Sequence, residues 1–228
     1  MKCIKLDNQR EREREVVNEI EIARMVDHPN IIRLFNYFLY KDFYILILPY
    51  YPDLSVLDFL QQVYNEGIPE SIASRMFFQM LGAVRYLHSI GICYNDIKCQ
   101  KFLVSNQNPN HPQVVLTNSS LSIILQDNET STNFCGTLQY MAPEIVKRIP
   151  YNHKVDVWSL GITLFVMLSG RFPFPNHHHN PKEMFKRIAN GQMNYDILFD
   201  KEISENAIDL IHQMCNVDPL SRISIHDA

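Results

Sequence analysis

The spacing of apolar residues changes partway along this chain, and the change limits the folds open to it. Near the N-terminus, apolar runs at 31–38 and 43–48 are short and are separated by the turn-forming pair Lys41-Asp42, which predicts a β-hairpin. After residue 70, apolar residues recur at steps of three and four, which is the period of an amphipathic helix. The residues with this spacing are Ala73, Met76, Phe77, Met80, Leu81, Val84 and Leu87. The sequence therefore predicts an α+β fold, with a small strand-rich first part and a larger, mainly helical second part.

Further elements are expected from the same two patterns. A short strand is predicted at 2–6 and a helix at 10–26, which His28-Pro29 ends because the residue before a proline disfavours helical backbone. Predicted later in the chain are helices at 155–168, 181–189 and 205–215, and strands at 102–104 and 114–116. Residues 155–168 are too few and too polar to span a bilayer, so we expect a buried helix there and no membrane insertion.

Charge and cysteine content argue against several function classes. With a net charge of −4 and basic residues spread along its 228 positions, the chain offers no basic surface for nucleic acid. Five cysteines without a CxxC pair argue against a disulfide framework or a zinc knuckle, and favour a reducing, cytoplasmic compartment. The run His177-His178-His179 has no Cys, Asp or Glu at a metal-ligand interval, so we interpret it as a surface loop.

Three motifs follow one another in the second half of the chain. They are Ala142-Pro143-Glu144, Asp156-Val157-Trp158-Ser159-Leu160-Gly161, and Asp218-Pro219 followed by Arg222. In this order and spacing they resemble the serine/threonine type of the eukaryotic protein kinase family, and the overall similarity is to calmodulin-dependent and AMP-activated kinases. The resemblance implies that Asp156 caps the backbone of the catalytic loop and that Arg222 pairs with Glu144.

The resemblance extends back through Tyr94-Asn95-Asp96-Ile97-Lys98 and His28-Pro29-Asn30-Ile31-Ile32, and so covers nearly the whole chain. It implies a two-lobed, protein-kinase-like fold. Residues 1–50 would form a partial N-lobe without its first strands and glycine-rich loop, and residues 51–228 a mainly helical C-lobe that is truncated near its last helix.

The resemblance also implies an ATP site. Lys5 stands at the place of the strand lysine that grips the α- and β-phosphates, and Glu19 at that of the helix glutamate that orients it. Leu48 falls at the gatekeeper position. After it, the Pro49 carbonyl and the Tyr51 N–H offer the two backbone groups that an adenine edge needs. The alternative for Lys5, so near the start of the chain, is that it is merely solvated.

The catalytic loop keeps two of its working residues. Asp96 matches the aspartate that accepts the proton of the substrate hydroxyl, and Lys98 matches the lysine near the transferred phosphate. Asn95 replaces the arginine that normally binds an activation-loop phosphate. Control by phosphorylation of the segment 130–132 therefore loses its usual receptor.

Both positions that hold magnesium in the family are changed. Lys101 replaces the catalytic-loop asparagine, and its ammonium repels a divalent cation. Asn118 replaces the aspartate of the Asp-Phe-Gly triplet and lacks the anionic oxygen, while Ser119 replaces the phenylalanine. An ATP site remains chemically feasible, whereas magnesium binding at Lys101 and Asn118 is unfavourable and no metal site is expected.

These departures favour a pseudokinase, a kinase-shaped module that binds protein partners in intracellular signalling without efficient phosphoryl transfer. The alternative is an active serine/threonine kinase with an atypical metal site, in which Lys98, Lys5 or Lys101 supplies part of the metal's charge while Asp96 remains the base. A third interpretation is a decayed or truncated product without a stable fold.

Overall fold

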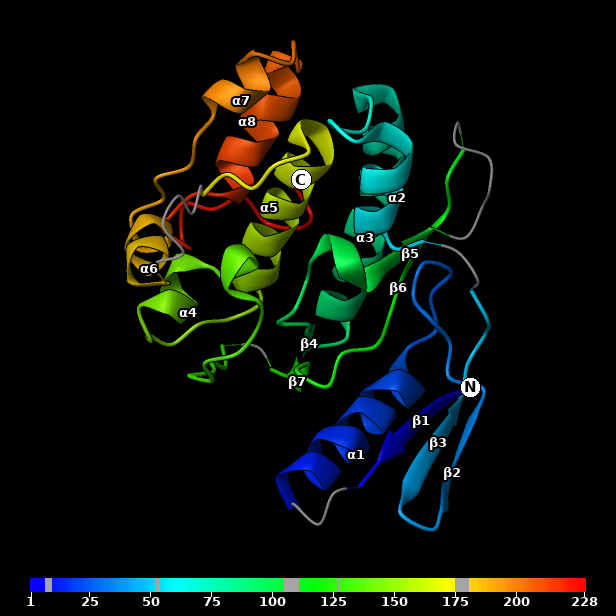
Figure 1. Cartoon of the computed structure of the whole chain (residues 1–228). Helices are drawn as coiled ribbons and strands as arrows, with labels where there is room; N and C mark the ends of the chain where they lie inside the picture. The colour runs from blue at the N-terminus through cyan, green and yellow to red at the C-terminus, as the bar shows by residue number, and fades with distance from the viewer. Residues whose placement is uncertain (7–9, 52–53, 105–110, 127, 175–180) are drawn as a thin grey trace.

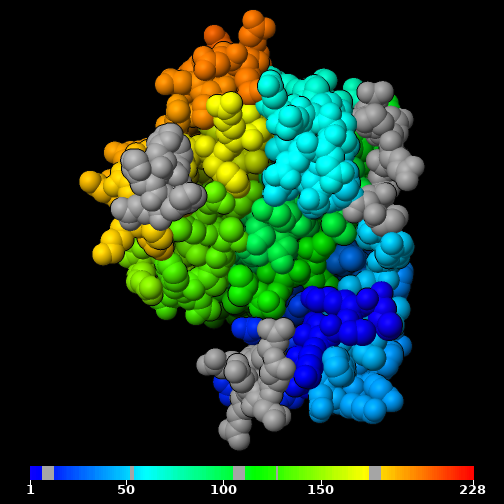
Figure 2. Space-filling model, in the orientation of Figure 1, coloured from blue at the N-terminus to red at the C-terminus, as the bar shows by residue number. Residues whose placement is uncertain are grey.

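The computed structural model describes residues 1–6, 10–51, 54–104, 111–126, 128–174 and 181–228, so the run His177-His178-His179 lies outside the described residues. A small N-terminal part, drawn in blue, lies beneath a larger and mainly helical part (Figure 1). The space-filling view shows the two parts in contact (Figure 2). The expected α+β fold is confirmed. None of the described helices is long and apolar enough to cross a membrane.

The N-terminal part is a three-stranded antiparallel sheet with one helix against it. Its elements are β1 (Lys2–Lys5), α1 (Arg10–Met25), β2 (Asn36–Tyr40) and β3 (Phe43–Ile47), and the strand order is β1-β3-β2. The predicted hairpin is therefore present as β2 and β3, and Lys41 in its turn has a positive φ of 52°.

Apolar side chains of α1 and β3 join the helix to one face of the sheet. Val16 and Ile20 lie one turn apart on α1 and pack with Leu46 of β3, which is fully buried. Successive side chains of a strand point to opposite faces, and residues paired directly across a ladder share a face. Because Lys2 is paired with Leu46, its side chain is on the α1 face, and Lys5, three positions on, is on the opposite face.

The larger part is built around α5 (Lys154–Ser169). Every residue of this helix from 155 to 169 is buried, which explains why its sequence is apolar on all sides. At Gly161, an added Cβ would lie 2.6 Å from the Cys215 Sγ, so glycine permits the close approach of α8 (Glu205–Met214). The remaining helices of this part include α3 (Glu70–Ser89), α4 (Pro143–Val146), α6 (Pro181–Ala189) and α7 (Asp196–Phe199).

Two short pairs of strands lie between α3 and α4 in the sequence and connect the loops of this region. β4 (Ile92–Cys93) pairs with β7 (Ile123–Ile124), and β5 (Phe102–Val104) pairs with β6 (Val114–Leu116). Single 3₁₀ turns are formed by Cys99–Lys101 and Leu138–Tyr140. The loop at 94–98 is therefore held between β4 and the first of these turns.

The apolar pattern missed one helical segment at the start of the larger part. α2 (Val56–Phe59) continues directly into a π-helical turn at Leu60–Tyr64. Ser55 Oγ accepts a hydrogen bond from the Asp58 N–H at 3.2 Å, and the Asp58 carboxylate accepts one from the Ser55 N–H at 3.0 Å. This reciprocal capping box is a helix-start signal that the spacing of apolar residues does not reveal.

Candidate functional site

The backbone of the loop at 94–98 is hydrogen-bonded to Asp156 of α5. The fully buried carboxylate accepts hydrogen bonds from the backbone N–H groups of Tyr94 at 2.8 Å and Asn95 at 2.9 Å, and it lies 2.9 Å from His88 Nε2. Asn95 has a φ of 64°, a left-handed conformation that asparagine tolerates better than most residues. The cap that the sequence predicted for Asp156 is confirmed.

A second buried contact joins α4 to the end of the chain. Arg222 donates from Nη1 to Glu144 Oε1 at 2.7 Å and from Nη2 to Oε2 at 3.0 Å, and both side chains are buried. Two parallel bonds satisfy both carboxylate oxygens, which is the strong geometry for this pair. The guanidinium also lies 5.3 Å from the centre of the Trp158 ring. The predicted pairing of Arg222 with Glu144 is confirmed.

The Asp96 carboxylate, at the other side of the loop, is engaged through both oxygens. Its Oδ1 accepts a hydrogen bond from Thr137 Oγ1 at 2.8 Å, and its Oδ2 lies 3.0 Å from Lys98 Nζ. Lys98 Nζ also donates to Thr137 Oγ1 at 2.6 Å. The three side chains form a closed triangle that fixes the position of the carboxylate.

Lys101 brings a second ammonium group to the same carboxylate. Its Nζ lies 3.5 Å from Asp96 Oδ2, and the Lys101 side chain keeps 27% of its surface exposed. The 3₁₀ turn directs this residue back toward the loop, because the Lys101 N–H donates to the Lys98 carbonyl at 2.9 Å. Sequence reasoning identified Lys101 as a residue that repels metal, but it did not foresee this ion pair.

Asn118 follows β6, one residue after Thr117, whose backbone is bonded to that of Lys101 at the end of the β5–β6 pair. The Thr117 N–H donates to the Lys101 carbonyl at 2.8 Å, and the Tyr94 hydroxyl donates to the Thr117 carbonyl at 2.9 Å. The side-chain nitrogen of Asn118 is buried and has no hydrogen-bond partner among the described residues. Because a buried, unsatisfied donor costs about 1–3 kcal/mol, this amide is a candidate partner for an acceptor atom on a ligand.

Glu19 of α1 pairs with Lys2 and not with Lys5, which corrects the expected pairing. Lys2 Nζ lies 2.5 Å from Glu19 Oε1, and the glutamate is buried. The physical reason is strand alternation, which directs Lys2 toward α1 and leaves Lys5 exposed on the other face. The apolar residue Ile4 could have indicated which lysine faces α1, because Ile4 shares the face of Lys2 and packs against the α1 cluster.

Comparison with known proteins identifies the family of this chain. The family model described as "Protein kinase domain" matches residues 1–228. The chain belongs to the protein kinase family. The expected kinase fold, with a small sheet-containing N-lobe and a helical C-lobe, is therefore confirmed.

Serine/threonine kinases and related proteins are among the relatives of this kinase domain. It is 33% identical over 233 residues to "Probable serine/threonine-protein kinase fhkD" of Dictyostelium discoideum, which covers 97% of this chain and 31% of that protein. It is 31% identical to "Calcium/calmodulin-dependent protein kinase type 1" of Caenorhabditis elegans, over 100% of this chain and 64% of the relative. It is 31% identical to "CaM kinase-like vesicle-associated protein" of Danio rerio, over 100% of this chain and 52% of that protein. The chain thus spans less than two thirds of the length of each of these three relatives.

Kinase domains bind ATP, and the residues predicted to hold adenine lie on the segment that leaves β3. Leu48, Pro49 and Tyr51 are all half-buried there, and Leu48 packs against the α1 cluster. This segment connects the two lobes (Figure 1). The contacts of these three residues with adenine stay a prediction, as do the catalytic roles of Asp96 and Lys98.

At the two positions where the family pattern holds magnesium, the residues of this kinase domain do not fit the ion. Magnesium takes oxygen ligands and in proteins is usually held through one or two carboxylates. Lys101 instead presents a cation, and Asn118 presents a neutral amide. The nearby Asp96 carboxylate is bound by two lysines. Within the described ranges, no group of three or more His, Cys, Asp or Glu side chains lies close enough together to hold a metal ion.

The activation segment of this kinase domain makes backbone, cation–π and side-chain contacts. Ser131 and Tyr151 exchange two backbone hydrogen bonds, at 2.8 and 2.9 Å. The guanidinium carbon of Arg148 lies 4.2 Å from the centre of the Phe134 ring. Asn95, at the position of the phosphate-binding arginine, donates its side-chain amide to a backbone carbonyl of the segment at 3.0 Å.

One contact that sequence reasoning missed joins α1 to this segment. Asn18 Nδ2 donates to the Ser122 carbonyl at 2.7 Å, and the buried Ser122 hydroxyl donates to the Tyr94 carbonyl at 3.3 Å. The N-lobe helix is therefore tied to the catalytic loop through a single serine. No periodic pattern marks an isolated asparagine on a helix, so this link could not be predicted from the sequence.

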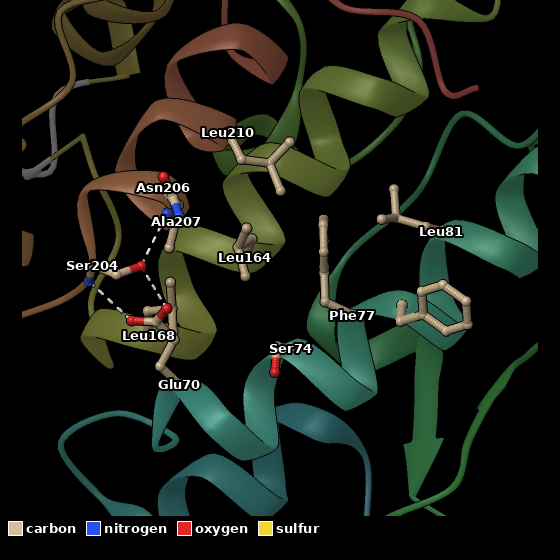
Figure 3. A pocket seen from close by; sticks show the side chains of 11 residues that line it. Glu70, Ser74, Phe77, Leu81, Leu164, Leu168, Ser204, Asn206, Ala207 and Leu210 are labelled. Atoms are coloured by element: carbon tan, nitrogen blue, oxygen red, sulfur yellow. Dashed lines mark hydrogen bonds between the residues drawn. The ribbon is translucent and has the colours of Figure 1, made fainter. Parts of the chain in front are cut away.

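Figure 3 shows a groove on the C-lobe. Helices α3, α5 and α8 line it with apolar side chains that include Leu164 and Leu168, and at its rim Ser204 donates to Glu70 from its hydroxyl at 2.6 Å and from its N–H at 2.9 Å. Phe78 lines the groove with 76% of its surface exposed. No residue of the Asp96 cluster lines it, so we assign no catalytic chemistry to this groove.

Proposed function

We propose that this kinase domain is a pseudokinase, a binding or regulatory module of intracellular signalling in which phosphoryl transfer is impaired. One observation carries the proposal. The Lys101 ammonium lies 3.5 Å from Asp96 Oδ2, where the family pattern has a neutral asparagine that binds metal. It opposes a divalent cation and competes with a substrate hydroxyl for the oxygen that would take its proton.

The size of the expected impairment follows from the charge that phosphoryl transfer develops. A bound metal ion stabilises this charge by several kcal/mol, so its loss slows the reaction by roughly a thousandfold or more. Asn118, at the second position, has an amide where the family pattern has a carboxylate. Both changes therefore act in the same direction.

The molecule would act through binding to protein partners. A net charge of −4 favours such partners over nucleic acid or an anionic membrane surface. All five cysteines are free, which supports a reducing, intracellular setting. We propose that Lys2, held by Glu19 at 2.5 Å, takes the nucleotide-binding role first expected of Lys5.

One observation favours the alternative of an active serine/threonine kinase. Asp96, Thr137 and Lys98 keep a closed set of contacts at 2.6–3.0 Å, which positions the carboxylate and an ammonium for work on a phosphoryl group. In that alternative the lysines would supply charge that a metal supplies elsewhere.

A phosphoryl-transfer assay separates the two functions. The chain would be incubated with ATP labelled at the γ-phosphate, magnesium and a generic protein substrate, beside Asp96→Asn as the background. The pseudokinase proposal expects the same incorporation from both proteins, and expects Lys101→Asn combined with Asn118→Asp to exceed them. A rate in the unaltered chain that Asp96→Asn abolishes would establish the alternative instead. A cooperative thermal melt of each protein checks that it is folded and tests the third interpretation, a chain without a stable fold.

A further inference from the structure

The two changed positions alter the charge of the site by the amount that one magnesium ion carries. Lys101 adds one positive charge where the family pattern has a neutral asparagine, and Asn118 removes one negative charge where it has an aspartate. The chain is thus more positive by two unit charges at this place than the pattern it resembles. These charges are covalently part of the protein and need no ion from solution.

The groups at this place can donate to an anion. The Lys101 ammonium is part-exposed, and its 3.5 Å contact with Asp96 Oδ2 is longer than the 3.0 Å contact that Lys98 makes with the same atom. Lys101 can therefore turn toward a ligand while Lys98 and Thr137 continue to hold Asp96. The anionic group that faces both lysines is Asp96, and after Lys101 turns away, Lys98 still balances its charge.

Asn118 supplies the second donor and an independent indication of a ligand. Its side-chain nitrogen is buried without a hydrogen-bond partner, beside the backbone that bonds Lys101. An amide N–H donates well to a phosphate oxygen, whereas the aspartate of the family pattern would repel one unless a cation lay between them. A donor buried without a partner is satisfied by such an oxygen.

We propose that Lys101 and Asn118 bind the polyphosphate of a nucleoside triphosphate directly, with no divalent cation between protein and phosphate. This rests on the proposed function, in which the nucleotide site is kept for binding rather than transfer. The phosphate carries its full charge only when it is free of metal. Magnesium in solution therefore competes with the protein for the phosphate oxygens instead of joining it to the protein.

The test is calorimetric titration of the chain with ATP, at fixed ionic strength, in EDTA and in excess magnesium chloride. We expect binding in EDTA that is about tenfold tighter than in magnesium, because the metal occupies oxygens that the two donors need. Inorganic tripolyphosphate, used as a second probe, should bind in EDTA as well and compete with ATP. Binding that requires magnesium, or that tripolyphosphate does not displace, would overturn the inference.

Matched variants identify the donors. Lys101→Met should weaken ATP binding in EDTA by about tenfold or more, and Asn118→Leu by about tenfold, because each removes a donor and nearly keeps the volume. Lys147→Met, which removes an exposed lysine from the end of α4, should leave the affinity unchanged. Melting each variant without ligand checks its fold, and Lys101→Gln and Asn118→Met provide second variants where needed. Unchanged affinity in folded Lys101 variants would reject the proposal.

The binding titration and the phosphoryl-transfer assay can fail independently of each other. A chain that transfers no phosphate and binds neither ATP nor tripolyphosphate leaves the pseudokinase proposal standing and overturns this one. A chain that binds ATP only with magnesium and transfers phosphate overturns both.

Discussion

Asp156 accepts two hydrogen bonds from the backbone of the catalytic loop, whereas the Asp96 carboxylate is bound by the side chains of Thr137, Lys98 and Lys101. We refer to Asp156 with the Glu144–Arg222 pair as the frame, and to Lys101 with Asn118 as the front. The frame keeps the contacts that the kinase pattern predicts, and the front departs from that pattern at both positions. The two differ in their physical roles, because the frame satisfies buried charges and backbone groups, whereas the role we propose for the front is to bind a ligand.

This difference separates the requirements of folding from those of chemistry. Removing one partner of a buried pair leaves a charge or donor without compensation, so substitution in the frame is costly to the fold. Lys101 remains part-exposed, and its substitution alters mainly the charge that a ligand meets. A chain can therefore lose a metal site and remain a well-formed kinase domain.

The largest expected effect comes from breaking the frame at Arg222. Arg222→Met leaves Glu144 buried without its partner, so we expect the free energy of unfolding to fall by about 3–5 kcal/mol. Urea denaturation measures the change. The double variant with Glu144→Gln should recover part of the loss, and a fall below about 1 kcal/mol for the single variant would show that the pair is not needed for stability.

Removal of the Asp156 cap should lower the free energy of unfolding somewhat less than Arg222→Met does. Asp156→Ala leaves the backbone N–H groups of Tyr94 and Asn95 without an acceptor, and we expect a loss of roughly 2–4 kcal/mol in the free energy of unfolding. Asp156→Asn, which keeps one acceptor oxygen, should lose less. Equal losses for the two variants would mean that the hydrogen bonds to the loop are not the cause.

Within β1, a pair of matched substitutions tests the pairing of Lys2, and not Lys5, with Glu19. Lys2→Met should lower the free energy of unfolding by about 1 kcal/mol, because the pair with Glu19 is lost while solvent screens the 45% exposed lysine. Lys5→Met should change it by less than about 0.5 kcal/mol. Denaturation curves of the two variants side by side give the answer, and a larger effect at Lys5 would contradict the pairing.

The smallest effect is expected in the activation segment. Thr130→Glu and Thr132→Glu, which introduce the charge of a phosphate mimic at exposed positions, should shift stability by less than about 0.5 kcal/mol. Asn95, which occupies the receptor position, is neutral and already donates to a carbonyl of the segment. Thermal melts test this, and a clear stabilisation by either glutamate would reveal a receptor elsewhere.

Much of the frame could be predicted from the sequence, because short motifs specify its contacts. Asp156, Glu144 and Arg222 are recognisable by motif neighbours that lie close to them in the sequence, and their contacts follow from the fold that those motifs imply. The long helices and the strands of three or more residues were equally accessible, since their apolar residues repeat at regular intervals, whereas the two-residue strands β4 and β7 are too short to show such a pattern.

The contacts of the front and of β1 were harder to predict from the sequence. The ion pair between Lys101 and Asp96 depends on a 3₁₀ turn of three residues, too short to leave a periodic signal. The Lys2–Glu19 pair depends on which residues of the four-residue strand β1 face α1. That orientation is determined by the register of β1 with β3. A shift by an odd number of positions changes the face, and Lys2 and Lys5 differ by three.

The cap at Asp156 also bears on how this domain could be redesigned. The shape of the loop is set by a carboxylate 61 positions after Asn95 in the sequence, and substitutions at 101 and 118 do not touch it. A library randomised at those two positions should therefore consist largely of folded members. Selection on such a library could move the site between preference for anions and preference for metal ions on one unchanged backbone.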